Sequence, residues 1–325
     1  MCLPSPHHTI LLLLCAFLLA GCGQSERTLA IATGGPAGLY YPFGGAMASL
    51  WSEVLPGVNA KAEVTGGSVT NVIQVARQES DLGIAMADVV SSAYAGTGRF
   101  PEALPLRVLF TAYPNVVHML SLRDSGIKTI DDLAGKRVAL GAQGSGTSVA
   151  ALNIITGLGL SLDDIAPRYL SFGETTTGLK DGTLDAGFVV GGLGIAAVTE
   201  LSVTRDIEII ALSDAEIARL TQRFPAYSGY EIPGETYVGV SESRQTLGIW
   251  SAVVVHETMP EALAYALPCT VYRDHPRLLA VSPVVKDMTP ANIHQLPAVP
   301  LHPGTERYLQ NPQAACTSPV AVTAQ

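Results

Sequence analysis

The chain has 325 residues, of which 48% are hydrophobic and 14% charged, and this composition excludes an intrinsically disordered protein. Its 19 Lys and Arg residues against 28 Asp and Glu residues give a net charge of −9 without any basic cluster, so we expect no nucleic-acid partner. The longest apolar run, residues 10–20, is too short to span a membrane, and the length allows about two domains.

The N-terminus carries the pattern of a secretion signal. Residues 1–21 are predicted to be a signal peptide, because the apolar run ends in Leu19-Ala20-Gly21 directly before Cys22. This end resembles the lipobox of bacterial lipoproteins, in which cleavage leaves the cysteine lipidated; a short buried N-terminal helix is the alternative. We therefore expect a lipid on Cys22, a linker at residues 22–27, and a domain in the periplasm or cell envelope that touches the membrane only through its lipid anchor.

Strand-like and helix-like segments alternate after this linker. Short apolar runs bounded by Gly and Pro predict strands at residues 29–33, 60–64, 82–85, 106–113, 116–122, 137–141, 186–190 and 207–212. Helical spacing predicts helices at residues 40–55, 69–77, 147–158 and 257–267, a helical turn at 131–133, and a mixture of helix and loop at 276–301. The alternation predicts an α/β fold with a largely parallel sheet, in which the runs at 186–190 and 207–212 are buried strands.

Three glycine-rich segments link a predicted strand to a predicted helix. They are Thr33–Tyr41 (TGGPAGLYY), Thr65–Asn71 (TGGSVTN) and Gly141–Thr147 (GAQGSGT). Such turns lie at the carboxyl ends of strands, and their free N–H groups and helix dipoles attract anions. Glycine that serves only a tight turn is the alternative for any one of them. Three such turns, each with Ser or Thr, predict a binding site.

Signatures of enzymes and metal sites are absent from the sequence. It contains no GxGxxG, no GxxxxGK[ST] and no GxSxG, and neither HExxH nor a paired CxxC occurs. Glu174, Asp181 and Asp185 lie close in sequence, but helix caps and turns explain such residues better than acid–base pairs. We therefore expect no enzyme, no cofactor and no metal.

Two cysteines remain after the signal peptide and the lipidated residue are set aside. Cys269 follows a predicted helix, and Cys316 lies in a tail with little apolar content. An extracytoplasmic compartment permits disulfides, and a bridge would pin this tail to the domain. We predict the bridge; two free thiols are the alternative.

Six segments resemble the TAXI family, the substrate-binding proteins of tripartite TRAP-type transporters. They are IATGGPAGLYYPFGGAMA at 31–48, TGGSVTNVIQVARQESDLGIAMAD at 65–88, LGAQGSGTSVAALNII at 140–155, LKDGTLDAGFVVGG at 179–192, IPGETYVGV at 232–240 and LHPGTERYL at 301–309. The resemblance implies a two-lobed periplasmic-binding-protein fold of type II, each lobe a mainly parallel sheet flanked by helices, with the ligand in the cleft between them. It also implies delivery of glutamate-like or other small carboxylates to a membrane permease.

The resemblance and the sequence together suggest where the lobes divide. Lobe one would contain residues 28–113 and 213–325, and lobe two would contain residues 114–212. Pro114-Asn115 would lie at the first crossing and act as a hinge.

The candidate ligand-binding residues come from the turns and from the family pattern. They are Gly35, Gly38, Tyr40, Ser68, Asn71, Asp88, Gly144, Ser145, Gly146, Thr147 and Gly191. The resemblance places Tyr40 against the ligand and makes Asp88 a partner for the ammonium of an amino acid; a helix cap is the alternative for Asp88. Since the three turns contain no Lys or Arg, we expect N–H groups and hydroxyls to hold the carboxylate without a salt bridge.

The sequence thus predicts a monomeric, lipid-anchored solute-binding protein. It would capture a small carboxylate or amino acid by lobe closure and deliver it to TRAP-type permease subunits. The alternative is a ligand sensor that passes its closed state to a receptor or kinase.

Overall fold

The computed structural model describes residues 27–296, 298–312, 314 and 316. The predicted signal peptide, Cys22 and most of the linker lie outside these residues. Among the described residues, each helix is too short or too polar to cross a membrane.

The described chain forms ten strands and ten α-helices. The strands are β1 (Arg27–Ala32), β2 (Val58–Glu63), β3 (Leu82–Met86), β4 (Leu106–Leu122), β5 (Arg137–Ala139), β6 (Ala166–Arg168), β7 (Ala186–Gly191), β8 (Ile207–Ile209), β9 (Tyr227–Ile232) and β10 (Arg244–His256). The helices are α2 (Tyr40–Val54), α3 (Ser68–Ala76), α4 (Ala87–Ala95), α5 (Gly146–Leu158), α6 (Phe172–Lys180), α7 (Ala196–Thr204), α8 (Asp214–Arg223), α9 (Glu261–Arg273), α10 (His275–Leu279) and α11 (Pro303–Gln310).

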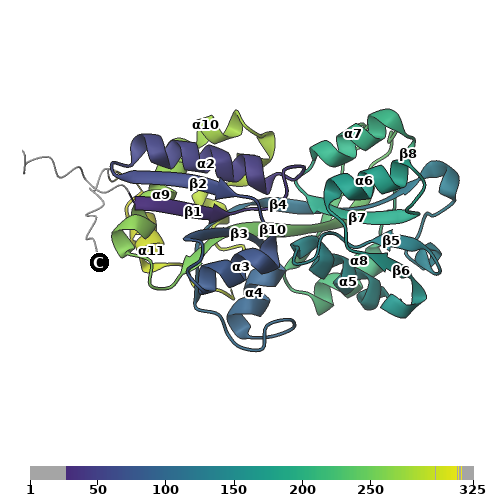
Figure 1. Ribbon diagram of the computed structural model, residues 1–325, viewed down its shortest axis with the longest axis horizontal. Helices are drawn as coiled ribbons and strands as arrows, with labels where there is room; N and C mark the ends of the chain where they lie inside the picture. Colours follow the sequence, from purple (N-terminus) through teal and green to yellow (C-terminus); the bar gives the residue numbers. More distant parts are fainter. Residues whose placement is uncertain (1–26, 297, 313, 315, 317–325) are drawn as a thin grey trace, which may run out of the picture.

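All ten strands belong to one mixed sheet with the order β2-β1-β3-β10-β4-β7-β5-β6, to which β8 adds beside β4 and β9 beside β10. The pairs β1–β2, β1–β3, β5–β6 and β5–β7 are parallel, whereas the long strands β4 and β10 run antiparallel to each other. These two long strands join two groups of elements, each with helices on both faces of the sheet (Figure 1). The first group contains β1–β3, α2–α4 and α9–α11, and the second group contains β5–β9 and α5–α8. The parallel βα units therefore lie at the two ends, and antiparallel strands connect them.

Burial follows from this arrangement. The residues of β3 and β7 are all buried, as expected of strands covered on both faces. One apolar cluster lies under α3, α4 and α5 and extends across both groups, whereas separate clusters form under α2 with α9 and under α6 with α7. The face under α3, α4 and α5 is thus packed continuously between the two groups.

The region predicted as two strands around Pro114-Asn115 is one strand, β4. Pro114 pairs with Trp250 of β10, and the register shifts between Trp250 and Ala252. This irregularity allows a proline in a central strand, because a bulge does not require its missing N–H. The predicted interruption between two strands is therefore a local bulge within β4. It lies where the chain passes from the first group to the second.

The second lobe boundary expected from the sequence, at residue 213, differs from the structure. Helix α8 packs on α5, and β9 pairs with residues 244–249 of β10, so this stretch belongs with the second group. The chain returns near Trp250, which is paired with Pro114. The run at 207–212 also differs from expectation: β8 is antiparallel to β4.

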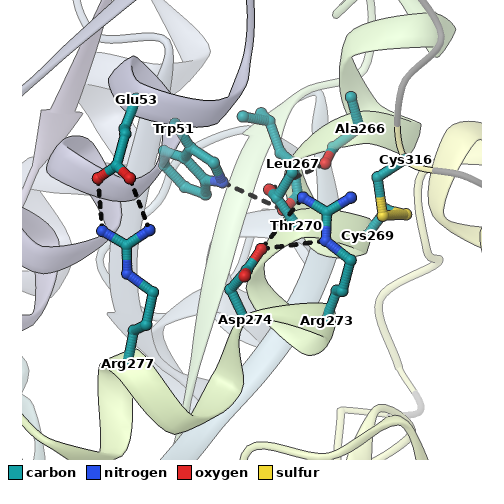
Figure 2. A network of polar contacts seen from close by, with 10 residues as sticks. All are labelled: Trp51, Glu53, Ala266, Leu267, Cys269, Thr270, Arg273, Asp274, Arg277 and Cys316. Atoms are coloured by element: carbon teal, nitrogen blue, oxygen red, sulfur yellow. Dashed lines mark hydrogen bonds and ion pairs between the residues drawn. A yellow bond between two sulfur atoms is a disulfide. The ribbon is translucent and has the colours of Figure 1, made fainter.

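The C-terminal elements close over the first group through α9. Pro268 lies inside this helix and has no N–H for the carbonyl of Ala264, which accepts a hydrogen bond from the Thr305 hydroxyl at 3.4 Å instead. The disulfide predicted between Cys269 and Cys316 is present and ties α9 to the segment beyond α11 (Figure 2). On the other side of α9, the indole Nε1 of Trp51 donates to the Leu267 carbonyl at 3.1 Å, which joins α9 to α2.

Candidate ligand-binding site

A cavity of about 340 Å³ lies between the two groups of elements. Its walls come from the turns between β1 and α2, β2 and α3, β5 and α5, and β6 and α6, together with the ends of β3 and β7 and the middle of β4. The turns surround the cavity because each follows the carboxyl end of a strand, where parallel α/β sheets bind their ligands.

The turn between β1 and α2 forms the wall in the first group. The N–H of Gly38 donates to the carbonyl of Gly35 at 3.0 Å, which closes a tight turn before α2 begins at Tyr40. A side chain at Gly38 would lie 3.4 Å from the ring of Phe172, which belongs to α6 in the second group. A Cβ atom at this position would therefore just come into contact with the second group.

The second and third glycine-rich turns touch directly across the cavity. The N–H groups of Val69 and Thr70, in the first turn of α3, donate to the carbonyl of Gly144 at 3.0 and 3.2 Å. A Cβ atom on Gly146 would lie 2.6 Å from the Ser68 hydroxyl. The structure is thus closed at this point, and two N–H groups in the first turn of α3 are bound to protein.

Helices α5 and α6 begin at the cavity with unoccupied donors. Ser145 caps α5 by accepting from the N–H of Ser148 at 3.0 Å, and Ser171 caps α6 by accepting from Glu174. Within the described part of the chain, the N–H groups of Gly146, Thr147, Phe172 and Gly173 make no hydrogen bond to protein. These first-turn donors and the positive ends of two helix dipoles favour a negatively charged group.

Two tyrosines from the first group line the same cavity. The hydroxyl of Tyr40 accepts from the Asn115 amide at 3.2 Å, and the rings of Tyr40 and Tyr113 meet edge to face at 6.3 Å. Burial raises the pKa of both hydroxyls well above the usual tyrosine range. Both residues are therefore neutral hydrogen-bonding groups at physiological pH.

The described residues that line the cavity include no Asp, Glu, Lys, Arg or His. Arg137, the nearest arginine in sequence to the third turn, makes two hydrogen bonds to the carboxylate of Asp185, at 2.7 and 2.9 Å. This pairing lowers the pKa of Asp185 to about 2. Arg137 is thus engaged with Asp185 and does not line the cavity.

Of the eleven candidate residues, the structure places eight in the cavity wall: Gly35, Gly38, Tyr40, Ser68, Ser145, Gly146, Thr147 and Gly191. Asn71 is buried below it and donates to the carbonyls of Thr33 and Ile84, so it joins β1 to β3. Gly144 does not line the cavity, and its carbonyl accepts from the N–H groups of Val69 and Thr70 in α3.

Asp88 also lies outside the cavity wall. It is buried in the first turn of α4, where it accepts from the N–H of Val89 at 2.8 Å and from the Tyr227 hydroxyl at 2.9 Å. It borders a second hollow of about 490 Å³ whose walls include α4, α5 and residues 295, 296 and 298. Burial raises the pKa of Asp88 to about 6. The side chain therefore connects α4 to β9 instead of facing the candidate site.

Several lining residues were not among the sequence candidates, including Met86, Tyr113, Asn115, Ser171 and Phe172. The pattern Ser171-x-x-Glu174 is a capping box and marks the start of α6, so it was a usable signal for the fourth turn. Tyr113 and Asn115 had no local signal, because their role depends on the path of β4 between the groups.

In the part of the chain that the structure describes, no group of three or more His, Cys, Asp or Glu residues is arranged to hold a metal ion. The candidate site therefore consists of backbone donors, hydroxyls, one amide and apolar side chains.

The chain is similar to proteins of one family and one fold. The model of the NMT1-like family matches residues 31–311. The structure resembles MatC from Rhodopseudomonas palustris with bound malate, with a TM-score of 0.56 and 14% identity over 88% of this chain and 96% of that chain. It also resembles the periplasmic aliphatic sulphonate binding protein SsuA from Escherichia coli, with a TM-score of 0.49 and 15% identity over 89% and 84% of the two chains.

At 14% identity the similarity to MatC establishes the fold alone, a mixed α/β fold with a curled sheet flanked by helices. The family model extends over most of the chain, from β1 to the end of α11. The chain therefore belongs to the NMT1-like family.

Proposed function

We propose that this protein is an extracytoplasmic solute-binding lipoprotein that captures a small organic carboxylate and delivers it to a TRAP-type permease. The observation that carries the proposal is the pair of free helix starts, at α5 and α6, which face a cavity without cationic side chains. A carboxylate accepts several N–H donors at once, and hydrogen bonds to a charged group are about twice as strong as neutral ones.

We propose that the two groups close around the ligand, and that this closed form tells the permease that the protein is loaded. Ser68 and Gly146, from opposite groups, lie together at the cavity edge, so a ligand between them would stabilise the closed form. A permease that recognises the closed form would then receive only loaded protein. The TRAP-type partner and the lipid on Cys22 are supported by the sequence resemblance.

The similarity to MatC supports the ligand class in a limited way. That protein has the same fold and is described with bound malate, which is a carboxylate. The present chain would use the corresponding arrangement of lobes with its own lining residues.

A thermal-shift screen followed by calorimetry tests the proposal. We expect at least one small carboxylate to raise the midpoint of unfolding, because a ligand that binds only the folded state stabilises it. Thr147→Val keeps the shape of a lining side chain and removes its hydroxyl, and we expect it to weaken the binding of this ligand about tenfold. Failure of every small anion to shift the midpoint would contradict the proposal.

Arg137→Gln is the matched control for these measurements. It removes the cation nearest to the third turn, and its partner is Asp185 and not the cavity. We expect lower stability and an affinity within about twofold of the parent protein. Loss of binding in this variant alone would show that a salt bridge holds the ligand.

A further inference from the structure

A chain of three hydrogen-bonded side chains crosses from the first group to the second. The hydroxyl of Tyr227, at the start of β9, donates to the carboxylate of Asp88 in α4 at 2.9 Å. The amide of Asn153 in α5 donates to the same hydroxyl at 2.8 Å. Since Asp88 belongs to the first group and the other two residues to the second, the bond from Tyr227 to Asp88 joins the two groups directly.

The Asp88 carboxylate depends on this bond. Burial raises the pKa of Asp88 to about 6, so the side chain is ionised at neutral pH. Its two donors within the described residues are the Tyr227 hydroxyl and the N–H of Val89, which lies in the same helix. A buried charge that loses one of two donors is strongly destabilised, so contact between the groups satisfies a charge that α4 alone does not.

The packing around this chain is otherwise apolar. Val89 and Val90 of α4 and Ile154 of α5 belong to the apolar cluster that extends across both groups. Apolar contact is non-directional, whereas a hydrogen bond requires one distance and one direction, so the chain selects one arrangement of the groups. Asp88 and Asn153 also line the second hollow, and separation of the groups would widen it and hydrate the carboxylate.

We propose that the Asp88–Tyr227–Asn153 chain is a latch, which stabilises the closed form of the protein through its own hydrogen bonds. In the closed form Tyr227 satisfies the buried carboxylate, and in an open form water replaces it. Tyr227 is a positioning residue, because it does not line the candidate site and acts on it through the approach of the two groups. The inference goes beyond the proposed function and does not require that a carboxylate binds.

Hydrogen exchange of the Val69 and Thr70 amides, followed by NMR without added ligand, measures the closed form. Both N–H groups donate to the Gly144 carbonyl across the two groups, so they exchange when the groups separate. We expect slow exchange in the parent protein and about tenfold faster exchange in Tyr227→Phe, because a hydrogen bond to a charged group is lost. The amide of Val75, inside α3, is the internal reference and should be unchanged.

Tyr237→Phe is the matched control. Tyr237 is buried, and its hydroxyl lies 2.8 Å from Nε2 of His118 and accepts from the N–H of Gly194 at 2.9 Å. None of these residues belongs to the first group. We expect this variant to lose stability, because a buried hydrogen bond is lost, without faster exchange at Val69 and Thr70.

A double-mutant cycle shows whether Asp88 and Tyr227 act through one bond. It consists of Asp88→Ala, Tyr227→Phe and the double variant. Residues that act through a shared contact have non-additive effects, so adding Tyr227→Phe to Asp88→Ala should change the exchange rate of Val69 and Thr70 by less than about twofold.

Three results would overturn the latch. They are unprotected Val69 and Thr70 amides in the parent protein, parent-like exchange in Tyr227→Phe, and a further tenfold increase when Tyr227→Phe is added to Asp88→Ala. Each leaves the proposed function standing, because carboxylate binding is measured separately by calorimetry.

Discussion

At the scale of single residues, two buried titratable side chains have opposite pKa shifts. Burial raises the pKa of Asp88 to about 6, and burial lowers the pKa of His118 to about 4. His118 belongs to β4, and its ring nitrogens lie 2.8 Å from the Tyr237 hydroxyl and 3.2 Å from the Val189 carbonyl of β7. Each group is more easily charged in the unfolded chain than in the folded protein.

The two shifts make opposite contributions to stability between about pH 4 and 6. The folded protein retains the Asp88 proton to higher pH than the unfolded chain, so this contribution falls as pH rises through the window. The unfolded chain protonates His118 first as pH falls, so that contribution rises with pH over the same window. Each difference corresponds to about 3 kcal/mol, so the two contributions oppose each other in the parent protein.

Asp88→Asn should therefore reveal the histidine contribution. We expect the free energy of unfolding of this variant to rise by about 2–3 kcal/mol more than that of the parent protein between pH 4 and 6.5. Urea unfolding at a series of pH values measures this. Asp124→Asn, at an exposed carboxylate, is the control. A profile of Asp88→Asn parallel to that of the parent would contradict the assignment.

The predicted lipid anchor is also a single-residue property. Cys22→Ala removes the only thiol that can carry the lipid in the lipobox pattern. Each buried methylene of an acyl chain stabilises membrane binding by about 0.8 kcal/mol, so the variant should leave the membrane fraction or remain uncleaved. Cell fractionation with immunoblotting measures this. Normal cleavage with full membrane retention would contradict the anchor.

At the scale of elements, the junction of α9 and α11 shows how a proline inside a helix is accommodated. Thr305 supplies a donor to the carbonyl that Pro268 leaves free, and Gly304 lies so close to α9 that an added Cβ would be 2.7 Å from the Tyr265 nitrogen. The disulfide holds the chain just beyond α11 against α9. These contacts keep the C-terminal elements on the first group.

Removal of the disulfide should loosen this junction. Cys269→Ala with Cys316→Ala opens a loop with a sequence separation of 47 residues. The loop-entropy model predicts a loss of about 4 kcal/mol in the free energy of unfolding. Thermal unfolding with and without reductant measures this for the parent protein and the double variant. Reductant should lower the midpoint of the parent only, and an unchanged midpoint would contradict a stabilising bridge.

At the scale of the whole molecule, closure depends on glycines that face the opposite group. Gly146 begins α5 with ordinary helical geometry, so alanine is acceptable to the helix itself. The obstacle is across the cavity, where its Cβ would lie 2.5 Å from the Met86 sulfur and 2.6 Å from the Ser68 hydroxyl. A side chain at Gly146 should therefore hinder closure of the two groups without disturbing the fold of α5.

Gly146→Ala should favour the open form. We expect a larger radius of gyration by small-angle scattering, ligand affinity reduced at least about tenfold, and little loss of stability. Gly45→Ala is the control, because Gly45 lies in α2 with no atom within 4 Å of the added Cβ. Parent-like scattering and affinity in Gly146→Ala would contradict the view that these contacts define the closed state.

The sequence determined the parts of this protein that depend on short-range chemistry. Glycine-rich turns before α2, α3 and α5, and apolar runs of strand length, specify local conformation within about ten residues, so the βα units at the two ends of the sheet were predictable. Eight of the eleven site candidates line the cavity, because most of them belong to these turns. The three exceptions, Asn71, Asp88 and Gly144, bind protein groups brought to them by other elements.

Only the tertiary structure decided how these units are joined. Strand β10 was not predicted, and it pairs with β3 on one side and β4 on the other, across more than 120 residues of sequence. Its register with β4 at Pro114 and Trp250 decides where the chain crosses and brings Tyr113 and Asn115 to the cavity. Pairing between distant strands depends on packing and register, which no local sequence pattern encodes. The position of β10 between β3 and β4 could therefore not be predicted from the sequence.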